Sequence, residues 1–123
     1  MRMLTSLSPR VHLLVRPSKR EEFISLFKDA LGCNITEHNV GPASPILLVA
    51  FEDGSSFSAE FTEDAPTECG TWLEFRSRDA SAVQQKLRDA GVREFRHGQS
   101  PHAYFSAPGG QVFRVVDVSY KGP

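Results

Sequence analysis

The chain has 123 residues, enough for one domain with its own hydrophobic core. Its 40% hydrophobic and 24% charged residues fit an ordinary globular protein, and its net charge of −1 argues against a nucleic-acid-binding protein. No apolar run is long enough for a membrane span, and residues 1–9 lack the apolar core of a signal peptide, so we expect a cytoplasmic protein.

The first half of the chain predicts a strand, a helix and three more strands. Alternating apolar residues and turn signals predict the strands over residues 10–16, 35–38, 46–51 and 55–61. A helix over 19–31 has Phe and Leu residues at helical spacing. Ser18 and Glu21 form a capping box at its start, and Gly32 ends it. An Asp-Gly pair at Gly54 predicts the hairpin between the last two strands.

The second half predicts the same order of elements. Its strands are expected over residues 71–76, 92–95, 103–105 and 111–118. A helix over 79–90 begins at Asp79, a good N-cap residue, and ends at Gly91. Two glycines after Pro108 predict the turn before the last strand.

The two halves form an internal repeat. His12 and Trp72 stand 60 residues apart (72 − 12) in the two first strands, and Gly32 and Gly91 stand 59 apart (91 − 32) at the helix ends. One βαβββ module cannot cover both faces of its sheet. We therefore predict an α+β domain of two βαβββ modules paired by pseudo-twofold symmetry. After an N-terminal lead-in over 1–9, the single domain over 10–123 comprises module one at about 10–62, a linker at about 63–70 and module two at about 71–120.

Four segments make the chain resemble the vicinal oxygen chelate superfamily, which includes glyoxalase I, bleomycin-resistance and fosfomycin-resistance proteins and extradiol dioxygenases. These segments are His12 in the first strand, Phe27–Gly32, Asp79–Val92 and Tyr104–Phe113. The resemblance extends over about residues 10–118 and implies the paired-module fold. It also implies a homodimer, because many relatives are dimers. It does not fix the activity, because one fold hosts many functions.

The resemblance also implies where a metal would bind. In the family's enzymes the ligands are a His on the first strand, a carboxylate or other ligand on the last strand of module one, a His on the first strand of module two and a Glu on the final strand. This sequence offers His12, with Glu60 or Ser58 in the second place, but has Trp72 and Arg114 at the other two. Indole nitrogen only donates, and a guanidinium repels a cation. We therefore expect no metal and no cofactor at this site, because a catalytic metal usually needs three protein ligands.

Strand alternation places one set of polar residues on the sheet face opposite the helices. The predicted ligand pocket comprises His12, Arg16, Glu60, Trp72, Glu74, Arg76, His102 and Arg114. Arg114 is expected to pair with Glu74 or Glu60, because an unpaired buried charge is very costly. Two interpretations remain open: these charges neutralise one another, or an arginine fork binds an anionic or carbonyl-bearing ligand. Trp72 is either a cavity filler or a stacking platform.

Three functions compete. We favour a metal-independent small-molecule binding protein, similar to the bleomycin-resistance branch, with a planar or aromatic ligand near Trp72. The alternative is a lyase or dioxygenase of the glyoxalase type, with a metal bound by His12, Glu60 and a third ligand that the pattern does not identify. His12, His102 and Glu60 could also form a displaced metal site. A third possibility is a non-catalytic interaction domain with a closed pocket. No catalytic residue is assigned, and Cys33 and Cys69 are interpreted as reduced thiols, because their spacing fits neither a metal site nor a disulfide framework.

Overall fold

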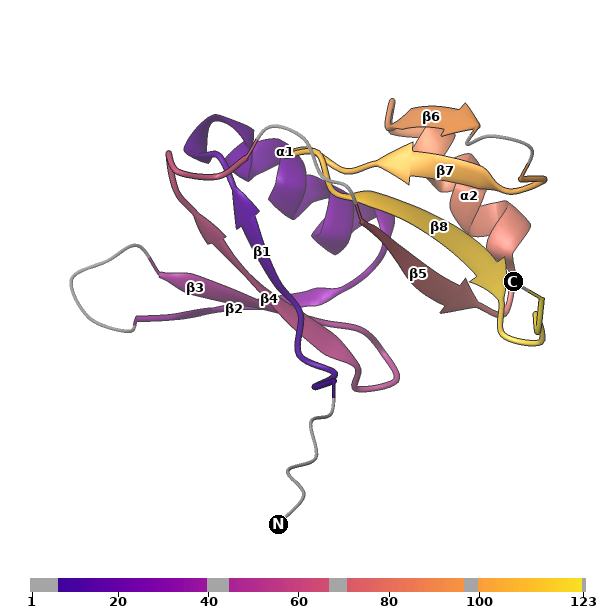
Figure 1. Cartoon of the computed structure of the whole chain (residues 1–123), viewed down its shortest axis with the longest axis horizontal. Coiled ribbons are helices and arrows are strands. Elements are labelled where there is room, and N and C mark those ends of the chain that lie inside the picture. Colours follow the sequence, from indigo (N-terminus) through magenta and orange to yellow (C-terminus); the bar gives the residue numbers. More distant parts are fainter. Residues whose placement is uncertain (1–6, 40–44, 67–70, 97–99, 123) are drawn as a thin grey trace, which may run out of the picture.

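Two four-stranded sheets dominate the computed structural model, which describes residues 7–39, 45–66, 71–96 and 100–122 (Figure 1). The first sheet has the order β1 (His12–Val15), β4 (Ser56–Phe61), β3 (Ile46–Ala50), β2 (Asn34–His38). The second has the order β5 (Trp72–Ser77), β8 (Val112–Asp117), β7 (Ala103–Ser106), β6 (Arg93–Arg96). In both sheets the first strand runs parallel to the last, and the other neighbours are antiparallel. The predicted α+β fold of two βαβββ modules is confirmed.

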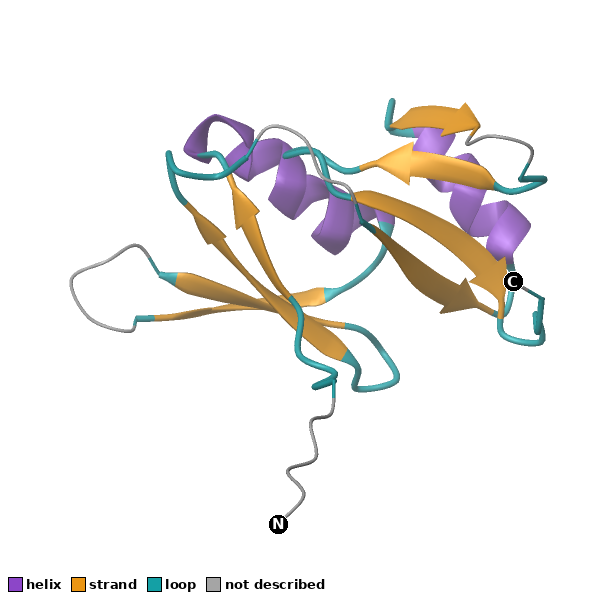
Figure 2. Cartoon of the chain, viewed as in Figure 1, coloured by secondary structure: helices purple, strands orange, loops and turns teal. Residues whose placement is uncertain are grey.

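The helical segment of module one, drawn among the purple helices of Figure 2, follows strand β1. It differs in detail from the expected regular helix. It consists of a 3-10 turn η1 (Pro17–Lys19), the α-helix α1 (Arg20–Ser25) and a π-helical stretch η2 (Leu26–Ala30). The predicted capping box of Ser18 and Glu21 is wrong. Ser18 lies inside the 3-10 turn, whose first residue is a proline, and no side chain caps the start of α1.

The helix of module two follows the prediction closely. Helix α2 (Ala80–Asp89) begins after Asp79, whose side chain accepts a hydrogen bond from the backbone nitrogen of Ala82 at 3.1 Å. Gly91 follows this helix with a φ of +77°, and Gly32 follows the helix of module one with a φ of +71°. Both predicted stop signals are confirmed, because this backbone region favours glycine.

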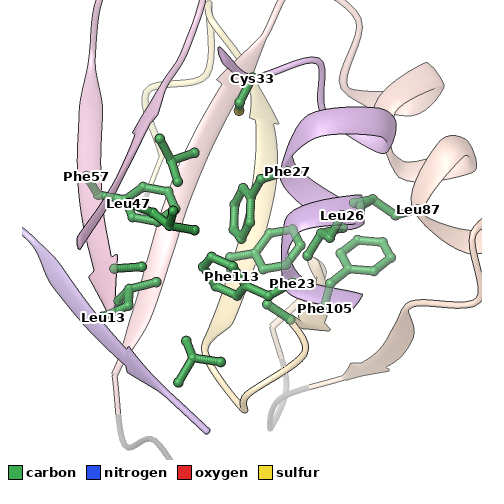
Figure 3. Packing of buried hydrophobic residues seen from close by; sticks show 14 of the residues in the cluster. Leu13, Phe23, Leu26, Phe27, Cys33, Leu47, Phe57, Leu87, Phe105 and Phe113 are labelled. Atoms are coloured by element: carbon green, nitrogen blue, oxygen red, sulfur yellow. The ribbon is translucent and has the colours of Figure 1, made fainter. Parts of the chain in front are cut away.

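A cluster of aromatic rings joins the two modules through α1 and η2 (Figure 3). The ring of Phe27 lies 5.0 Å from that of Phe57 in β4 and 6.2 Å from that of Phe75 in β5. The ring of Phe75 in turn lies 5.1 Å from that of Phe113 in β8. The helical segment of module one therefore lies between the two sheets and packs against both (Figure 1). The opposite face of each sheet points away from this core, and we call it the open face.

Parts of some predictions lie outside the described residues. These parts are residues 1–6 of the lead-in, residues 67–70 of the linker, and Cys69. Cys33 is a buried free thiol, and burial raises its pKa to about 11, so it remains protonated at neutral pH. No helix in the described part of the chain is long and apolar enough to cross a membrane.

Candidate functional site

The eight predicted pocket residues are divided between the two sheets. His12, Arg16 and Glu60 belong to β1, its end and β4. The other five belong to the second sheet or its margin: Trp72, Glu74, Arg76, His102 and Arg114. Each group makes its own ion pair, and because the two pairs lie on different sheets we describe them as two polar clusters.

Arg114 is the centre of the cluster on the second sheet. Strand register places it between Glu74 on β5 and Tyr104 on β7. Only 4% of Arg114 is exposed, and its Nε and Nη2 donate to Oε1 of Glu74 at 3.1 and 2.8 Å. Its guanidinium lies over the ring of Trp72, 4.4 Å from the centroid, in a cation–π contact. The predicted pairing of Arg114 with Glu74 is confirmed.

The charges of this cluster stabilise one another. Hydrogen bonding from Arg114 lowers the pKa of Glu74 against the opposing effect of desolvation, and Arg76 contributes to the same shift. Desolvation acts to lower the pKa of Arg114, but hydrogen bonds with Glu74 and Tyr104 outweigh it and the net shift is upward. The pair is therefore ionised at neutral pH. The cluster holds two guanidiniums, those of Arg76 and Arg114, against one carboxylate.

A turn after β8 completes this cluster at one end. The Nη1 atom of Arg76 donates to the backbone oxygens of Val118 at 3.3 Å and Tyr120 at 3.1 Å. The hydroxyl of Tyr120 lies 2.8 Å from Nε2 of His102, within hydrogen-bond distance. Tyr120 and Tyr104 are the two cluster residues that the sequence analysis misses. Alternation along the strand with His102 could have identified Tyr104, whereas Tyr120 follows the last strand and has no periodic signal.

The cluster on the first sheet is a chain of three side chains. Oγ of Ser58 lies 2.6 Å from Nδ1 of His12, and Oε1 of Glu60 lies 2.9 Å from its Nε2. The side chain of His12 is 32% exposed and that of Glu60 is 34% exposed. Glu60 therefore pairs with His12, and Glu74 alone of the two candidate carboxylates pairs with Arg114.

Arg16 lies at the margin of the first cluster. Its Nη1 lies 3.7 Å from a carboxylate oxygen of Glu63, and both side chains are exposed. Its Nε is buried and has no hydrogen-bond partner among the described residues. A surface ion pair of this length contributes little to stability.

The metal site of the related enzymes does not fit these residues. His12 and Glu60 bond to each other, Trp72 cannot ligate, and the buried charge of Arg114 disfavours a cation in its neighbourhood. The alternative site of His12, Glu60 and His102 is not formed among the described residues, and Nε2 of His102 lies 2.8 Å from the hydroxyl of Tyr120 instead. No group of three or more His, Cys, Asp or Glu residues in the described part of the chain could hold a metal ion.

Apolar side chains are also exposed on the open faces. Leu14 on β1 is 42% exposed, Leu48 on β3 is 37% exposed and Trp72 on β5 is 45% exposed. A groove of about 920 Å³ lies elsewhere, beside the helical segments. Its lining includes Glu22, Asp29 and Lys86, and none of the predicted pocket residues.

Comparison with solved structures identifies the fold. TnmS3, an antibiotic binding protein from Streptomyces sp. CB03234, matches with a TM-score of 0.64 and 20% identity, over 93% of this chain and 98% of its own. A glyoxylase/bleomycin resistance protein/dioxygenase domain from Frankia sp. EAN1pec matches with a TM-score of 0.67 and 14% identity, over 91% and 97%. The fosfomycin resistance protein FosX from Listeria monocytogenes matches with a TM-score of 0.70 and 11% identity, over 92% and 91%.

These likenesses cover nearly whole chains, and at such low identities they establish the fold. The chain has the glyoxalase/bleomycin-resistance/dioxygenase fold, which confirms the resemblance to the vicinal oxygen chelate superfamily at the level of architecture. No protein-family model matches the chain, and no curated protein matches it in sequence. The function must therefore be argued from the residues on the two open faces.

Proposed function

We propose that the protein binds a small molecule on the open face of its second sheet, without a metal. The observation that carries this proposal is the half-exposed indole of Trp72, whose ring has the guanidinium of Arg114 over it. An aromatic face with cationic groups beside it favours a planar or aromatic ligand that has an anionic or carbonyl group. TnmS3, which shares the fold, is described as an antibiotic binding protein.

Arg76 is the group that can contact the ligand's charge. Arg114 is buried and bonded to Glu74, whereas the side chain of Arg76 is 47% exposed. The guanidiniums of Arg76 and Arg114 carry two positive charges and the carboxylate of Glu74 carries one negative charge. A bound anion would therefore neutralise the charge of these three residues. Arg76 would exchange its bonds to the backbone oxygens of the C-terminal turn for bonds to the ligand, at little electrostatic cost.

Fluorescence of Trp72 tests this proposal directly, because it is the only tryptophan of the chain. A panel of planar aromatic carboxylates, with neutral amides of the same shape, should yield compounds that change the emission saturably and raise the Tm. Arg76→Ala should weaken the carboxylates about tenfold or more and affect the amides less. The matched control is Arg88→Ala, which removes an exposed arginine of α2 that pairs with Glu94. Failure of every compound would favour the interaction domain with a closed pocket.

Metal independence is tested in the same assay. Binding after exhaustive treatment with a chelator should equal binding before it, and added Mn²⁺ or Zn²⁺ should leave affinity unchanged. Loss of binding with the chelator and its recovery with one metal would instead support the lyase or dioxygenase alternative. A metal-dependent reading would also predict that His12→Ala abolishes the recovery.

We further propose that the protein is a homodimer whose open faces are partly covered by a second copy. Exposed apolar side chains on both sheets support this, because a symmetric interface would remove their apolar area from water. Sedimentation analysis should show a dimer. A double variant, Leu14→Glu with Leu48→Glu, should be monomeric, whereas Leu7→Glu, at a fully exposed position before β1, should remain dimeric. A monomeric parent chain would contradict this proposal.

A further inference from the structure

The three hydrogen-bonded side chains of Ser58, His12 and Glu60 on the first sheet have no role in the proposed binding site. They lie on the open face of β1 and β4, whereas the proposed ligand contacts belong to β5 and β8. Their geometry is that of a nucleophile, a base and an orienting carboxylate, each within hydrogen-bond distance of the next.

When the imidazole of His12 is neutral, the hydrogen bonds among these three side chains fix the positions of their protons. A carboxylate of Glu60 only accepts, so Nε2 of a neutral His12 carries the ring proton and donates at 2.9 Å. The lone pair of the ring is then on Nδ1, and the hydroxyl of Ser58 donates to it at 2.6 Å. The backbone oxygen of Val11 is the other acceptor near this hydroxyl, but it is 3.5 Å away. The basic nitrogen therefore faces the hydroxyl proton that a base would remove.

Regular backbone holds the three groups in place. His12 and Ser58 are direct partners in the parallel pairing of β1 with β4, and the backbone nitrogen of Ser58 donates to the oxygen of Val11 at 3.1 Å. Glu60 follows two residues later on β4, on the same face of the sheet. Side chains on neighbouring strands keep their geometry better than side chains on loops. The partial exposure of His12 leaves the cluster within reach of a solute.

We propose that Ser58 is a nucleophile toward activated carboxylic esters, with His12 as its general base and Glu60 as the carboxylate that orients the imidazole. The oxygen of Ser58 bonds to the ester carbonyl carbon while its proton passes to Nδ1 of His12. The bond from that carbon to the alkoxy group breaks, and the leaving alkoxide takes the proton. Water then attacks the acyl-serine by the reverse proton path, which releases the carboxylic acid and restores the hydroxyl.

Neighbouring side chains indicate the kind of acyl group. Leu48 is the register partner of Ser58 across β3 and β4, and Leu14 is the partner of Glu60 across β1 and β4. Both leucines are more than one-third exposed. In a single copy of the chain, where no second copy covers these leucines, an ester with an apolar acyl chain could place that chain against them while its carbonyl carbon meets Ser58. The substrate class is therefore an ester of a short or medium fatty acid with a good leaving group.

Nitrophenyl butyrate is a suitable probe. The release of nitrophenolate measures the rate of the reaction, and peptide mass mapping locates the butyryl group on the protein. The butyryl group should map to Ser58, and Ser58→Ala should remove both the adduct and the enzymatic release. His12→Gln should lower the rate about 100-fold or more, as for loss of a general base. Glu60→Gln should lower it less and should change its pH dependence, because the amide still fills the space but no longer holds the imidazole as a carboxylate does.

Matched controls separate this reaction from ordinary surface chemistry. Ser56→Ala removes an exposed serine on the same strand and face, two residues earlier, and should leave the rate unchanged. His38→Gln removes a histidine on β2 whose Nε2 lies 3.2 Å from Oγ1 of Thr36. It should also leave the rate unchanged. Thermal unfolding of every variant verifies that it is folded.

Acylation of Ser58 should be measured at protein concentrations above and below the dissociation constant of the proposed dimer. If Ser58 reacts only at the lower concentration, a second copy covers it in the dimer. The proposal is overturned if neither form is acylated at Ser58, or if Ser58→Ala and Ser56→Ala react at the same rate. It is independent of the Trp72 binding site, because the two proposals rest on different sheets.

Discussion

The two halves of the Glu74–Arg114 ion pair should differ in their importance for stability. The side chain of Arg114 is 5% exposed and that of Glu74 is 24% exposed. Glu74→Ala removes the acceptor of two Arg114 nitrogens and leaves a guanidinium inside the protein. Arg114→Met leaves Glu74 next to water and paired with Arg76 at 3.2 Å. We expect the first substitution to cost more free energy of unfolding than the second.

The expected magnitudes follow from burial. Removing one partner of a buried ion pair costs about 3–5 kcal/mol. Glu74 is partly exposed and Arg114 keeps its contacts with Tyr104 and Trp72, so we expect the lower end, about 3 kcal/mol, for Glu74→Ala. Methionine fills most of the space of Arg114 without a charge, so Arg114→Met should cost about 1 kcal/mol. A loss of about 3 kcal/mol lowers Tm by roughly 10 °C in a chain of this size.

Urea unfolding of both single variants and the double variant measures these costs and the coupling between the two residues. The double variant, Glu74→Ala with Arg114→Met, should be more stable than Glu74→Ala alone, because it has no stranded guanidinium. Arg88→Met, in an exposed ion pair, should have no measurable effect. Equal and negligible losses for both single variants would refute the reasoning, because they would mean that water already solvates both groups.

Two further predictions concern pH and backbone strain. The pKa of Glu74 is held below 4.5, so its charge stabilises the fold fully above about pH 4.5, and this stabilisation is lost as the pH falls through the lowered pKa. The Tm difference between the parent chain and Glu74→Gln should therefore shrink on acidification from about pH 6 to pH 3, and a constant difference would contradict the assignment. Gly54→Ala and Gly109→Ala both force alanine to a positive φ, at +91° and +100°, but only the new Cβ at Gly109 would lie 2.8 Å from Cγ1 of Val15. Urea unfolding should therefore show a loss of about 1 kcal/mol for Gly54→Ala and about 2–3 kcal/mol for Gly109→Ala, and equal losses would mean that Val15 moves freely.

The alternation of apolar and polar residues along each strand made the strands predictable from the sequence, together with the face of the sheet on which each side chain lies. On the face of the second sheet that packs on the core, Phe113 and Val115 are buried, and Leu73 and Phe75 contact the core although they are half-buried. Positive φ at the helix ends was predictable because few residues other than glycine adopt it. The 3-10 turn and π-helical stretch were not, because periodicity over a dozen residues does not distinguish closely related helical geometries.

The relative placement of the two groups of predicted pocket residues could not be derived from alternation. The alternation of side chains along the strands assigns His12 and Trp72 to open faces, but it does not predict the orientation of one sheet relative to the other. That orientation depends on long-range packing of rings such as Phe27 against Phe75. The C-terminal turn was missed for a related reason. Its contacts with Arg76 and His102 come from the tertiary fold and leave no local pattern.

Strand register gives Glu60 and Arg114 equivalent places in the repeat. Glu60 pairs with Leu14 on the first strand of module one, and Arg114 pairs with Glu74 on the first strand of module two. The same backbone position thus carries an anion in one module and a cation in the other. The anion lies within hydrogen-bond distance of His12, whereas the cation lies over the ring of Trp72. One repeated backbone therefore presents two surfaces of opposite chemistry, and this difference is the physical reason to assign nucleophilic reactivity to the first sheet and anion binding to the second.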